Sequence, residues 1–187
     1  GEFTSPIGIA IGPRDELFVA EFNANRVQRF TPQGKFLGQF PVLKNPGGIA
    51  VDARGRCYVS SMTQHRVGVY ETSGQPVTEW GGKQGAADDE FDQPGGMVMG
   101  PDGAVYVNDF YNKIIGHYEV PLTHPGRDRE RGRIWRIVYK GANGEAPKMP
   151  DITKSSAGEL VETLANNNLT LRMLAMNQLT DRIGKAC

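Results

Sequence analysis

Residues 94–118 read PGGMVMGPDGAVYVNDFYNKIIGHY, and they decide how the rest of the chain is interpreted. They contain a short apolar run, a Pro-Asp-Gly turn, a run rich in aromatic and β-branched residues, a polar corner and a third apolar run. The same order of runs occurs twice earlier, so that Ile9, Ile49 and Met97 are equivalent at offsets of 40 and 48 residues. The chain therefore contains three copies of one unit.

Each run has the composition of a strand or a turn. LFVA, CYVS and VYVN are rich in the residue types that are enriched in β-strands, and Gly, Pro and Asp between the runs supply turn conformations. Gly34 and Gly74 turn the first two copies into a fourth run. A unit of about 40 residues with three or four short strands is typical of a propeller blade. The sequence thus predicts a mainly β fold, a partial β-propeller of about three four-stranded blades at residues 1–40, 41–80 and 81–140.

The third copy departs from the other two after Tyr118. It inserts VPLTHPGRDRERGR, whose last two residues open residues 132–139, GRIWRIVY, in which apolar and polar side chains alternate as they do in a strand. We predict that residues 115–118 form the third strand of this blade and that residues 132–139 form its delayed outer strand. Trp80 and Trp135 are expected to fill gaps between blades.

The last part of the chain loses the β pattern. Residues 141–150, GANGEAPKMP, have the composition of a linker. In residues 151–187, Ser155 or Ser156 can cap a helix, and Glu159 is placed to complete a capping box with Ser156.

A second amphipathic helix is predicted from Leu169 to Ile183, after the turn Asn166-Asn167-Asn168. Two helices joined in this way form an αα-hairpin, the unit of HEAT-type solenoids, and here they would start a HEAT-like helical domain. Because one pair cannot bury its own apolar face, it must dock on the propeller or continue into further repeats.

Composition excludes some classes of partner. The chain has 21 Lys and Arg against 21 Asp and Glu, so no global field favours nucleic acid or an anionic membrane. No apolar run approaches the roughly 20 residues that a membrane span needs. Cys57 and Cys187 form no CxxC, CxxCH or zinc spacing, and they do not fix the redox compartment. Because the chain opens at Gly1 in the middle of a repeat, we expect a fragment of a longer protein.

The repeat resembles the NHL family of β-propellers over about residues 1–120. The resemblance is carried by GEFTSPIGIAI and ELFVAEFNANRVQRFTPQGKF, by NPGGIAVDARGRCYVS and HRVGVYETSGQ, and by EFDQPGGMVMGPDGAVYVNDFYNKI. The Asp that is usual at the polar corner in this family is replaced by Glu21 and Ser61 in the first two copies, and only Asp109 keeps it. A ligand shared by every corner is therefore not expected.

Residues 94–187 also resemble a narrower group. DFYNKIIGHYEVPLTHPGRDRERGRIWRIVYKG, followed by a helical segment, is similar to large multidomain planctomycete proteins of the membrane-bound dehydrogenase or haem-binding type. In that group a propeller related to pyrroloquinoline-quinone sugar dehydrogenases precedes HEAT repeats and a cytochrome c module. The resemblance implies a periplasmic or secreted bacterial protein. Haem c would belong to a missing domain, since no CxxCH is present, and no quinone-binding position matches residue by residue.

The polar corners supply the candidate ligand-binding residues. Glu21, Asn25, Asp109 and Asn112 could line one end of the propeller channel and bind a cation or a small polar ligand. Related lactonase-like propellers hold calcium with such side chains, which implies Glu21 and Asp109 as candidate metal ligands. The alternative is that these side chains bond to local backbone and fix the turn. His117, on the third run of the last copy, is either a ligand-binding residue or a packed one.

The inserted loop from His124 to Arg133 nearly alternates in charge. Arg127 and Asp128 are candidates for an anion or partner contact, because arginine forks suit carboxylates and phosphates. The alternative is an internal salt-bridge network that ties the loop to the last blade and to the helices.

Three functions remain open, because no Ser-His-Asp order, HExxH or phosphate-binding glycine loop is present. The first is a propeller scaffold, a ligand- or protein-binding module of a larger bacterial protein that contacts its own missing blades and helical repeats. The second is part of a quinone- or metal-dependent sugar or alcohol dehydrogenase, completed by missing blades and a cytochrome c domain. The third is a calcium-dependent lactonase- or lyase-like propeller. Calcium or pyrroloquinoline quinone is expected, if at all, in the full protein.

Overall fold

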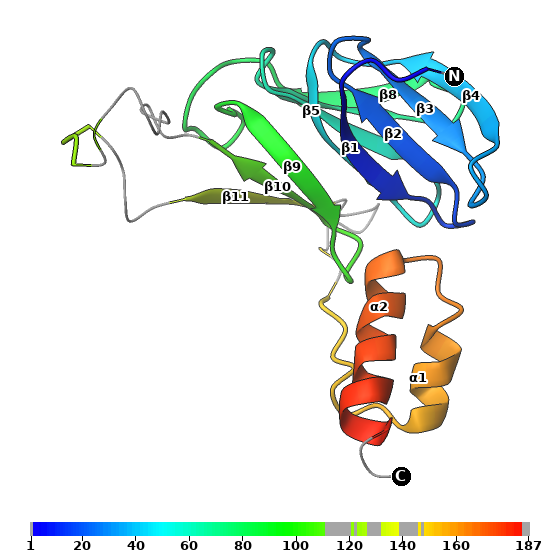
Figure 1. Ribbon diagram of the computed structural model, residues 1–187. Coiled ribbons are helices and arrows are strands. Elements are labelled where there is room, and N and C mark those ends of the chain that lie inside the picture. Colours follow the sequence, from blue (N-terminus) through cyan, green and yellow to red (C-terminus); the bar gives the residue numbers. More distant parts are fainter. Residues whose placement is uncertain are drawn as a thin grey trace.

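The computed structural model describes residues 2–110, 121, 123–126, 132–138, 146 and 148–184. In these residues, three antiparallel sheets stand side by side as propeller blades, and a pair of helices lies beyond one end of them (Figure 1). The predicted mainly β propeller fold with a helical hairpin is confirmed.

Blades 1 and 2 are four-stranded meanders in which each strand pairs with the next one in the sequence. Blade 1 consists of β1 (Pro6–Ile11), β2 (Leu17–Glu21), β3 (Arg26–Phe30) and β4 (Phe36–Pro41). Blade 2 consists of β5 (Pro46–Val51), β6 (Cys57–Ser61), β7 (Arg66–Tyr70) and β8 (Pro76–Gly81). Gly34 and Gly74 make the last turn of each blade with φ of 81° and 89°, a conformation that favours glycine.

The strand order of blade 3 differs from the prediction. Its described strands are β9 (Pro94–Met99), β10 (Val105–Asp109) and β11 (Arg133–Ile137), in the order β11-β10-β9. Residues 133–137 were predicted as the outer strand, but β11 pairs directly with β10 and takes the third position. The register explains this, because Arg133 lies opposite Asp109 as Arg26 lies opposite Glu21 in blade 1. The prediction for residues 115–118 lies outside the described residues.

The hydrophobic core lies between the blades. The first cluster joins the facing sides of blades 1 and 2 through Phe18, Ala20, Val27, Phe40, Ile49, Val51, Cys57, Val59 and Tyr70. The second joins blades 2 and 3 through Ala50, Tyr58, Val67, Val69, Phe91, Met99, Val105 and Val107, and Trp80 and Trp135 pack against it. The prediction that the two tryptophans fill gaps between blades is confirmed.

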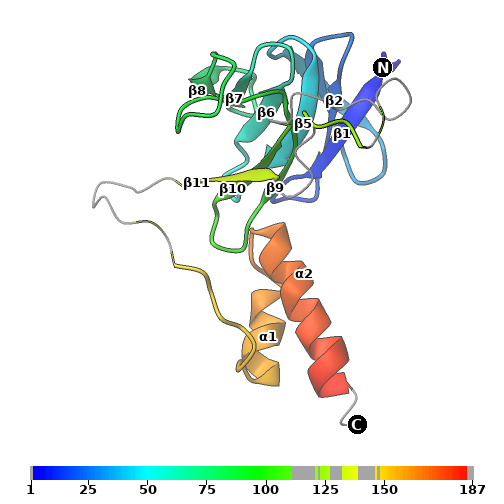
Figure 2. The same cartoon turned by 90° about the vertical axis from the view of Figure 1, so that its left-hand side faces the viewer.

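The inner strands β1, β5 and β9 run side by side along the inner edge of the blades (Figure 2). Blades 2 and 3 approach closely there, because a Cβ built on Gly48 would lie 2.4 Å from the carbonyl oxygen of Gly95. Burial differs between the inner strands: Ile49 of β5 is 4% exposed, whereas Ile9 of β1 is 65% exposed.

The first helix begins at one of the two predicted caps, and the second begins at the predicted residue. α1 (Ala157–Thr163) starts after Ser156, which forms a capping box with Glu159. α2 (Leu169–Gln178) starts after Asn168, whose side chain accepts from the Thr170 and Leu171 amides, and it continues as the π-helical turn η1 (Leu179–Ile183). None of the described helices is long and apolar enough to cross a membrane.

The first turn of α2 contacts the lower end of the blades (Figure 1). Asn168 Nδ2 donates to the Gly100 carbonyl at 2.8 Å, and the Thr170 hydroxyl donates to the Met99 carbonyl at 2.5 Å. Arg172 forms an ion pair with Asp15 in the β1–β2 turn at 2.8 Å. The helical pair is therefore held to both the first and the third blade.

Candidate functional site

The candidate site is the polar corner of each blade, where the second strand ends and the third begins. Glu21 ends β2 and Asp109 ends β10, and these carboxylates are 0% and 6% exposed. A buried carboxylate is costly unless it is paired and hydrogen-bonded. The groups around each carboxylate therefore decide what the corner does.

In blade 1, Glu21 accepts four hydrogen bonds, two on each oxygen. Arg26 donates from Nε at 2.6 Å and from Nη2 at 3.2 Å, Gln28 Nε2 donates at 2.8 Å, and the Thr4 amide donates at 2.5 Å. Burial acts to raise the pKa of Glu21, but the bonds from Arg26, Thr4 and Gln28 outweigh it and hold the pKa below its ordinary value. Because an ionised carboxylate offers about four acceptor sites, this one is saturated.

In blade 3, Asp109 repeats the arrangement with different residues. The Asp92 amide donates to Oδ1 at 2.8 Å, while Arg133 Nε and Trp135 Nε1 donate to Oδ2 at 2.9 and 2.8 Å. Arg133 also reaches the Gly85 carbonyl at 2.7 Å and so holds the link that precedes the blade. We call the buried carboxylate, the arginine opposite it and the amide of the preceding link the corner staple.

Blade 2 has no corner staple. Ser61 takes the carboxylate position, and its hydroxyl donates to the Lys44 carbonyl and accepts from the Gln64 amide. Arg66, opposite Ser61, pairs with Glu79 at 2.7 Å on the exposed side of β8 instead. The same backbone corner is thus built with and without a charge pair.

A second contact at the corners joins neighbouring blades. The side chain of Asn25 accepts from the Asn45 amide at 2.8 Å, and His65 Nδ1 accepts from the Gln93 amide at 3.2 Å. Asn25 and His65 both have φ of 52° and immediately precede the third strand of their blades. We call this contact, from a corner side chain to the amide just before the next blade, the latch.

The predicted site residues are not gathered in one place. Glu21 and Asp109 lie at the corners of different blades, and Asn25 belongs to the latch. The described part of the chain holds no group of three or more His, Cys, Asp or Glu that could bind a metal ion. Four further candidates lie outside the described residues: Asn112, His117, Arg127 and Asp128.

Calcium does not fit the two corner staples as they stand. It requires six to eight oxygen ligands, whereas an arginine and at least two other donors already occupy each carboxylate. A cation would have to displace Arg26 or Arg133. The arrangement suits fixing the corner, with the negative charge serving to hold the arginine.

Sequence reasoning missed the arginines that complete the staples. The signal was present, because Arg26, Arg66 and Arg133 each open a run of the form Arg-apolar-x-x-apolar. Aligning residues 133–137 on that arginine would have placed β11 in the third position. Of the inserted loop, His124 accepts from the Gly126 amide at 3.0 Å, and Arg133 belongs to the staple.

An apolar groove runs along the inner strands, toward the end of the blades opposite the corners. It has a volume of about 290 Å³, and its walls come from β1, β5 and β9, with the first turn of α2 at one end. Its lining includes Ile9, Ile11, Val51, Met99, Leu169 and Thr170. The groove offers hydrophobic contact and no ionisable group.

Two family models match parts of the chain. An NHL repeat matches residues 3–30, and a domain of unknown function (DUF7133) matches residues 83–141. The first match covers most of blade 1, and the second covers the link before blade 3 together with that blade. An NHL repeat in a propeller-like fold is therefore supported by both sequence and structure.

Known proteins similar to the chain are much longer. The protein brain tumor of Drosophila melanogaster is 29% identical over 97 residues, which cover 43% of this chain and 9% of that protein. A gluconolactonase from Xanthomonas campestris has a TM-score of 0.52 at 17% identity, covering 80% of this chain and 48% of that one. A virginiamycin B lyase from Staphylococcus aureus has a TM-score of 0.46 at 21% identity, covering 72% and 42%. The chain thus spans less than half the length of these proteins, and the structural likeness shows the fold alone.

Proposed function

We propose that this chain is a propeller scaffold, a binding module of a larger bacterial multidomain protein that holds a helical domain in a fixed position against its blades. The observation that carries the proposal is the attachment of α2. Asn168, which caps α2, and Thr170 and Arg172 in its first turn bond to two different blades. A helix held at three points on two blades cannot swing about a single hinge.

The corner staples support the same proposal. Glu21 and Asp109 are buried carboxylates, and their oxygens accept hydrogen bonds from donors within the blades. Side chains used in this way rigidify a blade, and a rigid platform is what a scaffold requires.

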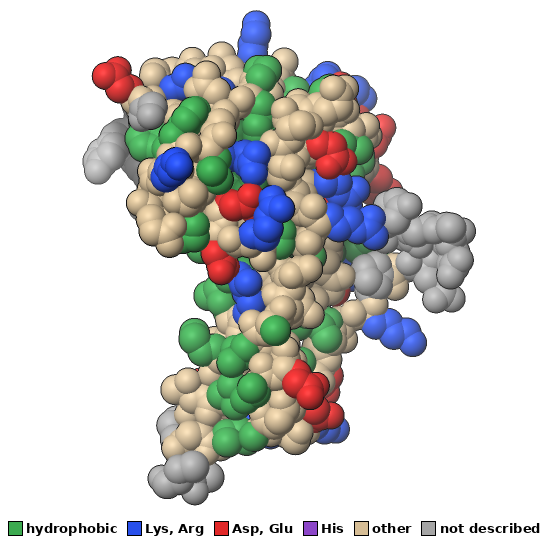
Figure 3. Space-filling model, turned by 90° about the vertical axis from the view of Figure 1, so that its right-hand side faces the viewer, with side chains coloured by type: hydrophobic (Ala, Val, Ile, Leu, Met, Phe, Trp, Pro, Cys, Tyr) green, Lys and Arg blue, Asp and Glu red, His purple; other side chains and the backbone are tan. Residues whose placement is uncertain are grey.

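The helical pair presents the surface to be positioned. Hydrophobic side chains gather on one side of it (Figure 3). Val161 of α1 and Met173 and Met176 of α2 are 57%, 51% and 52% exposed. In a HEAT-like domain the next helical pair would cover this side, since stacked repeats bury one another's apolar faces. We therefore propose further helical repeats as the first partner of the scaffold.

The proposal is tested by releasing the helical pair in the intact chain. In the double variant Asn168→Ala, Arg172→Ala, amide hydrogen exchange in α1 and α2 should rise, while exchange in β5 and β6 stays unchanged. Thr180→Ala, which removes a hydroxyl that bonds only within its own helix, is the matched control. If exchange in the helices does not change in the double variant, the blades do not position them and the proposal fails.

A second candidate is part of a quinone- or metal-dependent oxidoreductase, of the planctomycete dehydrogenase type that residues 94–187 resemble. The observation in its favour is the β10–β11 connection, which comprises residues 110–132, whereas four residues make this connection in the other blades. Long inserted loops on rigid scaffolds often carry function. Calorimetry of the full-length protein with calcium and with pyrroloquinoline quinone tests it, and no heat of binding with either would leave the scaffold as the function.

A further inference from the structure

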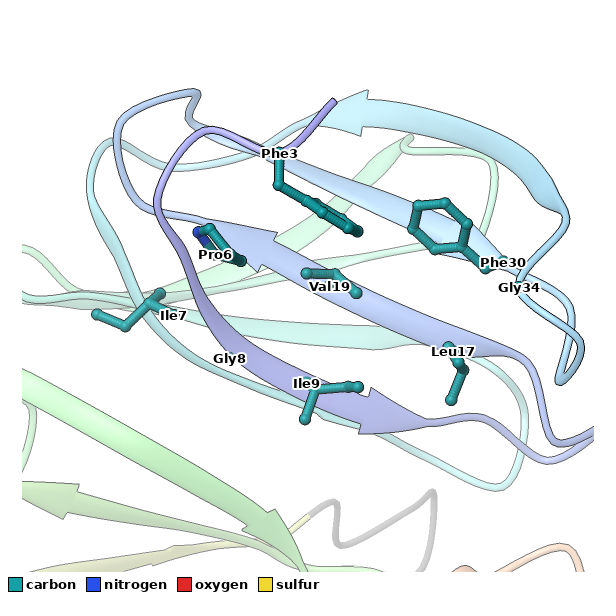
Figure 4. Close-up of a pocket in the computed structure, with 9 residues that line it drawn as sticks. All are labelled: Phe3, Pro6, Ile7, Gly8, Ile9, Leu17, Val19, Phe30 and Gly34. Carbon is teal, nitrogen blue, oxygen red and sulfur yellow. The ribbon is translucent and has the colours of Figure 1, made fainter. Parts of the chain in front are cut away.

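Two hollows in the described part of the chain differ in the chemistry of their walls. The first lies over blade 1, has a volume of about 530 Å³ and is lined by apolar side chains and glycine, among them Phe3, Ile7, Val19 and Phe30 (Figure 4). The second lies between blades 2 and 3, has a volume of about 300 Å³ and combines aromatic with acidic residues. Of the two, only the second can select a ligand by charge as well as by shape.

We call the second hollow the aromatic pocket. It is lined by Trp80 of β8, by Trp135 and Ile137 of β11, and by Asp88, Asp89 and Phe91 of the link that precedes β9. Phe91 is 5% exposed, whereas the two tryptophans are half-buried and so reach the solvent. The pocket is therefore an open site with three aromatic walls, placed where the outer strand of blade 2 meets the third strand of blade 3.

The three rings are held in fixed orientations. Trp135 Nε1 donates to Asp109 at 2.8 Å, and the Phe91 ring meets the Trp135 ring edge to face, at 80°. Tyr58, which does not line the pocket, stacks on Trp80 with the ring centroids 6.1 Å apart. Because walls that are already ordered lose little entropy when a ligand enters, the pocket is prepared for binding.

The two aspartates are the central residues of a tight turn in the link. The Glu90 amide donates to the Ala87 carbonyl at 3.0 Å and closes the turn around Asp88 and Asp89. A side-chain bond from Gln84 Nε2 to Asp92 Oδ1 at 2.8 Å joins the two ends of the link. The acidic pair is thus held beside the pocket by the fold of the link.

The described residues do not neutralise this acidic pair. Asp88 and Asp89 are exposed, and neither carboxylate accepts a hydrogen bond or lies within ion-pair distance of a described cation. The cations around the pocket are paired elsewhere: Lys83 with Glu90, Arg66 with Glu79 and Arg133 with Asp109. The pocket therefore carries net negative charge at its rim, which favours a cationic ligand.

The aromatic walls indicate which kind of cation fits. Aromatic faces attract cations, and quaternary ammonium groups are recognised by cages of such rings. The lining side chains other than the two aspartates are rings and an aliphatic chain, and they offer no hydrogen-bond acceptor. A primary ammonium or a guanidinium would lose hydrogen bonds to water against these walls, whereas a fully methylated ammonium has none to lose.

We propose that the aromatic pocket binds a methylated ammonium group. Trp80, Phe91 and Trp135 surround its methyl groups, and Asp88 and Asp89 supply the opposite charge. A volume of about 300 Å³ is at the lower end of the range for ligand pockets, which suits a small head group such as choline or the end of a trimethyllysine side chain. This inference goes beyond the proposed scaffold and does not depend on the attachment of α2.

The chain contains its own reporter for the test. Its two tryptophans, Trp80 and Trp135, both line the pocket, so intrinsic fluorescence responds to an occupant. Choline, added to the intact chain at constant ionic strength, should change the fluorescence saturably with a Kd on the order of 1 mM. The matched control is the neutral isostere of choline with a tert-butyl group in place of the trimethylammonium group, and it should bind about tenfold more weakly. No saturable change with choline, or equal affinity for the isostere, would overturn the proposal.

Trp80→Leu tests the aromatic wall. The substitution keeps apolar bulk at the rim and removes one ring, so the affinity for choline should fall by about fivefold, as measured through Trp135 fluorescence. The affinity for the neutral isostere should change by less than about twofold, since leucine still offers apolar contact. If both ligands lose affinity equally, the ring contributes bulk alone and the pocket is not a cation site.

The double variant Asp88→Asn, Asp89→Asn tests the charge at positions that are exposed, so the fold is preserved. Its affinity for choline should fall by about threefold at low salt, and the difference from the parent chain should shrink as salt is added. The matched control is Glu162→Gln, Asp181→Asn, which removes the same charge from exposed positions on the helices. An equal loss in the control would mean that overall charge, and not the pocket, attracts the ligand.

Two further ligands identify the source of the methylated ammonium. A short neutral peptide with a single trimethyllysine represents a side chain of a partner protein, and choline represents a free small molecule. Tighter binding of one of the two, seen in the same fluorescence titration, assigns the source. The peptide with unmodified lysine is the control, and tighter binding of that peptide than of its trimethylated form would overturn the proposal.

Discussion

The corners of blades 1 and 3 and the corner of blade 2 share one strand register, in which an arginine lies opposite the last residue of the second strand, and they differ in chemistry. Glu21 and Asp109 are buried with an arginine and a backbone amide, whereas Ser61 satisfies itself with backbone groups alone. The charge pair is therefore not needed to form the turn. It is found where the link from the preceding segment has to be held, since Arg26 also bonds to the Glu2 carbonyl and Arg133 to the Gly85 carbonyl.

The largest effect is expected from Asp109→Ala. The substitution leaves Arg133 and Trp135 without the oxygen that they share, in a place where the arginine side chain is only 15% exposed. Removing one partner of a buried pair costs about 3–5 kcal/mol of unfolding free energy. Urea denaturation followed by tryptophan fluorescence measures it.

Asp109→Asn is the companion variant, in case the alanine variant does not fold. It keeps one acceptor oxygen, and its free energy of unfolding should be lower than that of the parent chain by about 1–2 kcal/mol. A loss below about 0.5 kcal/mol, the range of ordinary surface substitutions, for both variants would mean that the staple is not structural and would return Asp109 to the ligand candidates.

Glu21→Gln should change how stability depends on pH. The pKa of Glu21 is lowered in the folded chain, so its stabilisation is complete above the ordinary pKa of 4.5 and is lost as the pH falls through the folded value. The variant should lose about 1–2 kcal/mol at pH 7 and show a flatter decline below about pH 4.5. Urea titrations at several values between pH 7 and pH 3 give the free energy of unfolding of both proteins as a function of pH. If the two curves are parallel, the staple in blade 1 is contradicted.

The sequence predicted the blades because the information that defines them is local. Runs of β-branched residues and turn glycines such as Gly34 and Gly74 specify strands and their order without reference to distant residues. The position of β11 required pairing across 23 intervening residues, and an alternating pattern is the same in a third strand as in a fourth. The opposition of Arg133 and Asp109 was the information that settled it, and it is a tertiary contact.

The candidate site was predicted less well for a similar reason. Glu21 and Asp109 were identified as the acidic corner residues, but whether an acid binds a ligand or an arginine depends on which donors the fold brings to it. Gln28 and Trp135 perform the same task at equivalent positions and have no chemical similarity apart from an N–H group. No composition or spacing rule links them.

Ser61→Ala tests the corner that lacks a charge pair. Its buried hydroxyl bonds to the Lys44 carbonyl and the Gln64 amide, both of which are backbone groups. Loss of this hydroxyl should lower the free energy of unfolding by about 1 kcal/mol, well below the effect of Asp109→Ala. Urea denaturation under the same conditions gives the loss of unfolding free energy for both variants. Equal losses for Ser61→Ala and Asp109→Ala would remove the distinction between the corners.

The smallest effect is expected from Arg66→Ala, and it sharpens the comparison most. Arg66 starts β7 as Arg133 starts β11, but its partner Glu79 keeps 53% of its side chain exposed, and Arg66 Nε is a buried donor without an acceptor. An exposed ion pair contributes little to the free energy of unfolding. Removing a buried donor that has no acceptor is favourable and offsets part of the loss of the pair. We expect a change within about 0.5 kcal/mol for Arg66→Ala, against about 3 kcal/mol or more for Arg133→Ala under the same urea titration. The two arginines occupy one position in the repeat, and Arg133 differs from Arg66 in having the carboxylate of Asp109 opposite and in bonding to the Gly85 carbonyl. If both substitutions cost the same, the backbone of the blade rather than the charge pair holds the corner, and Asp109 and Glu21 would be free for another role.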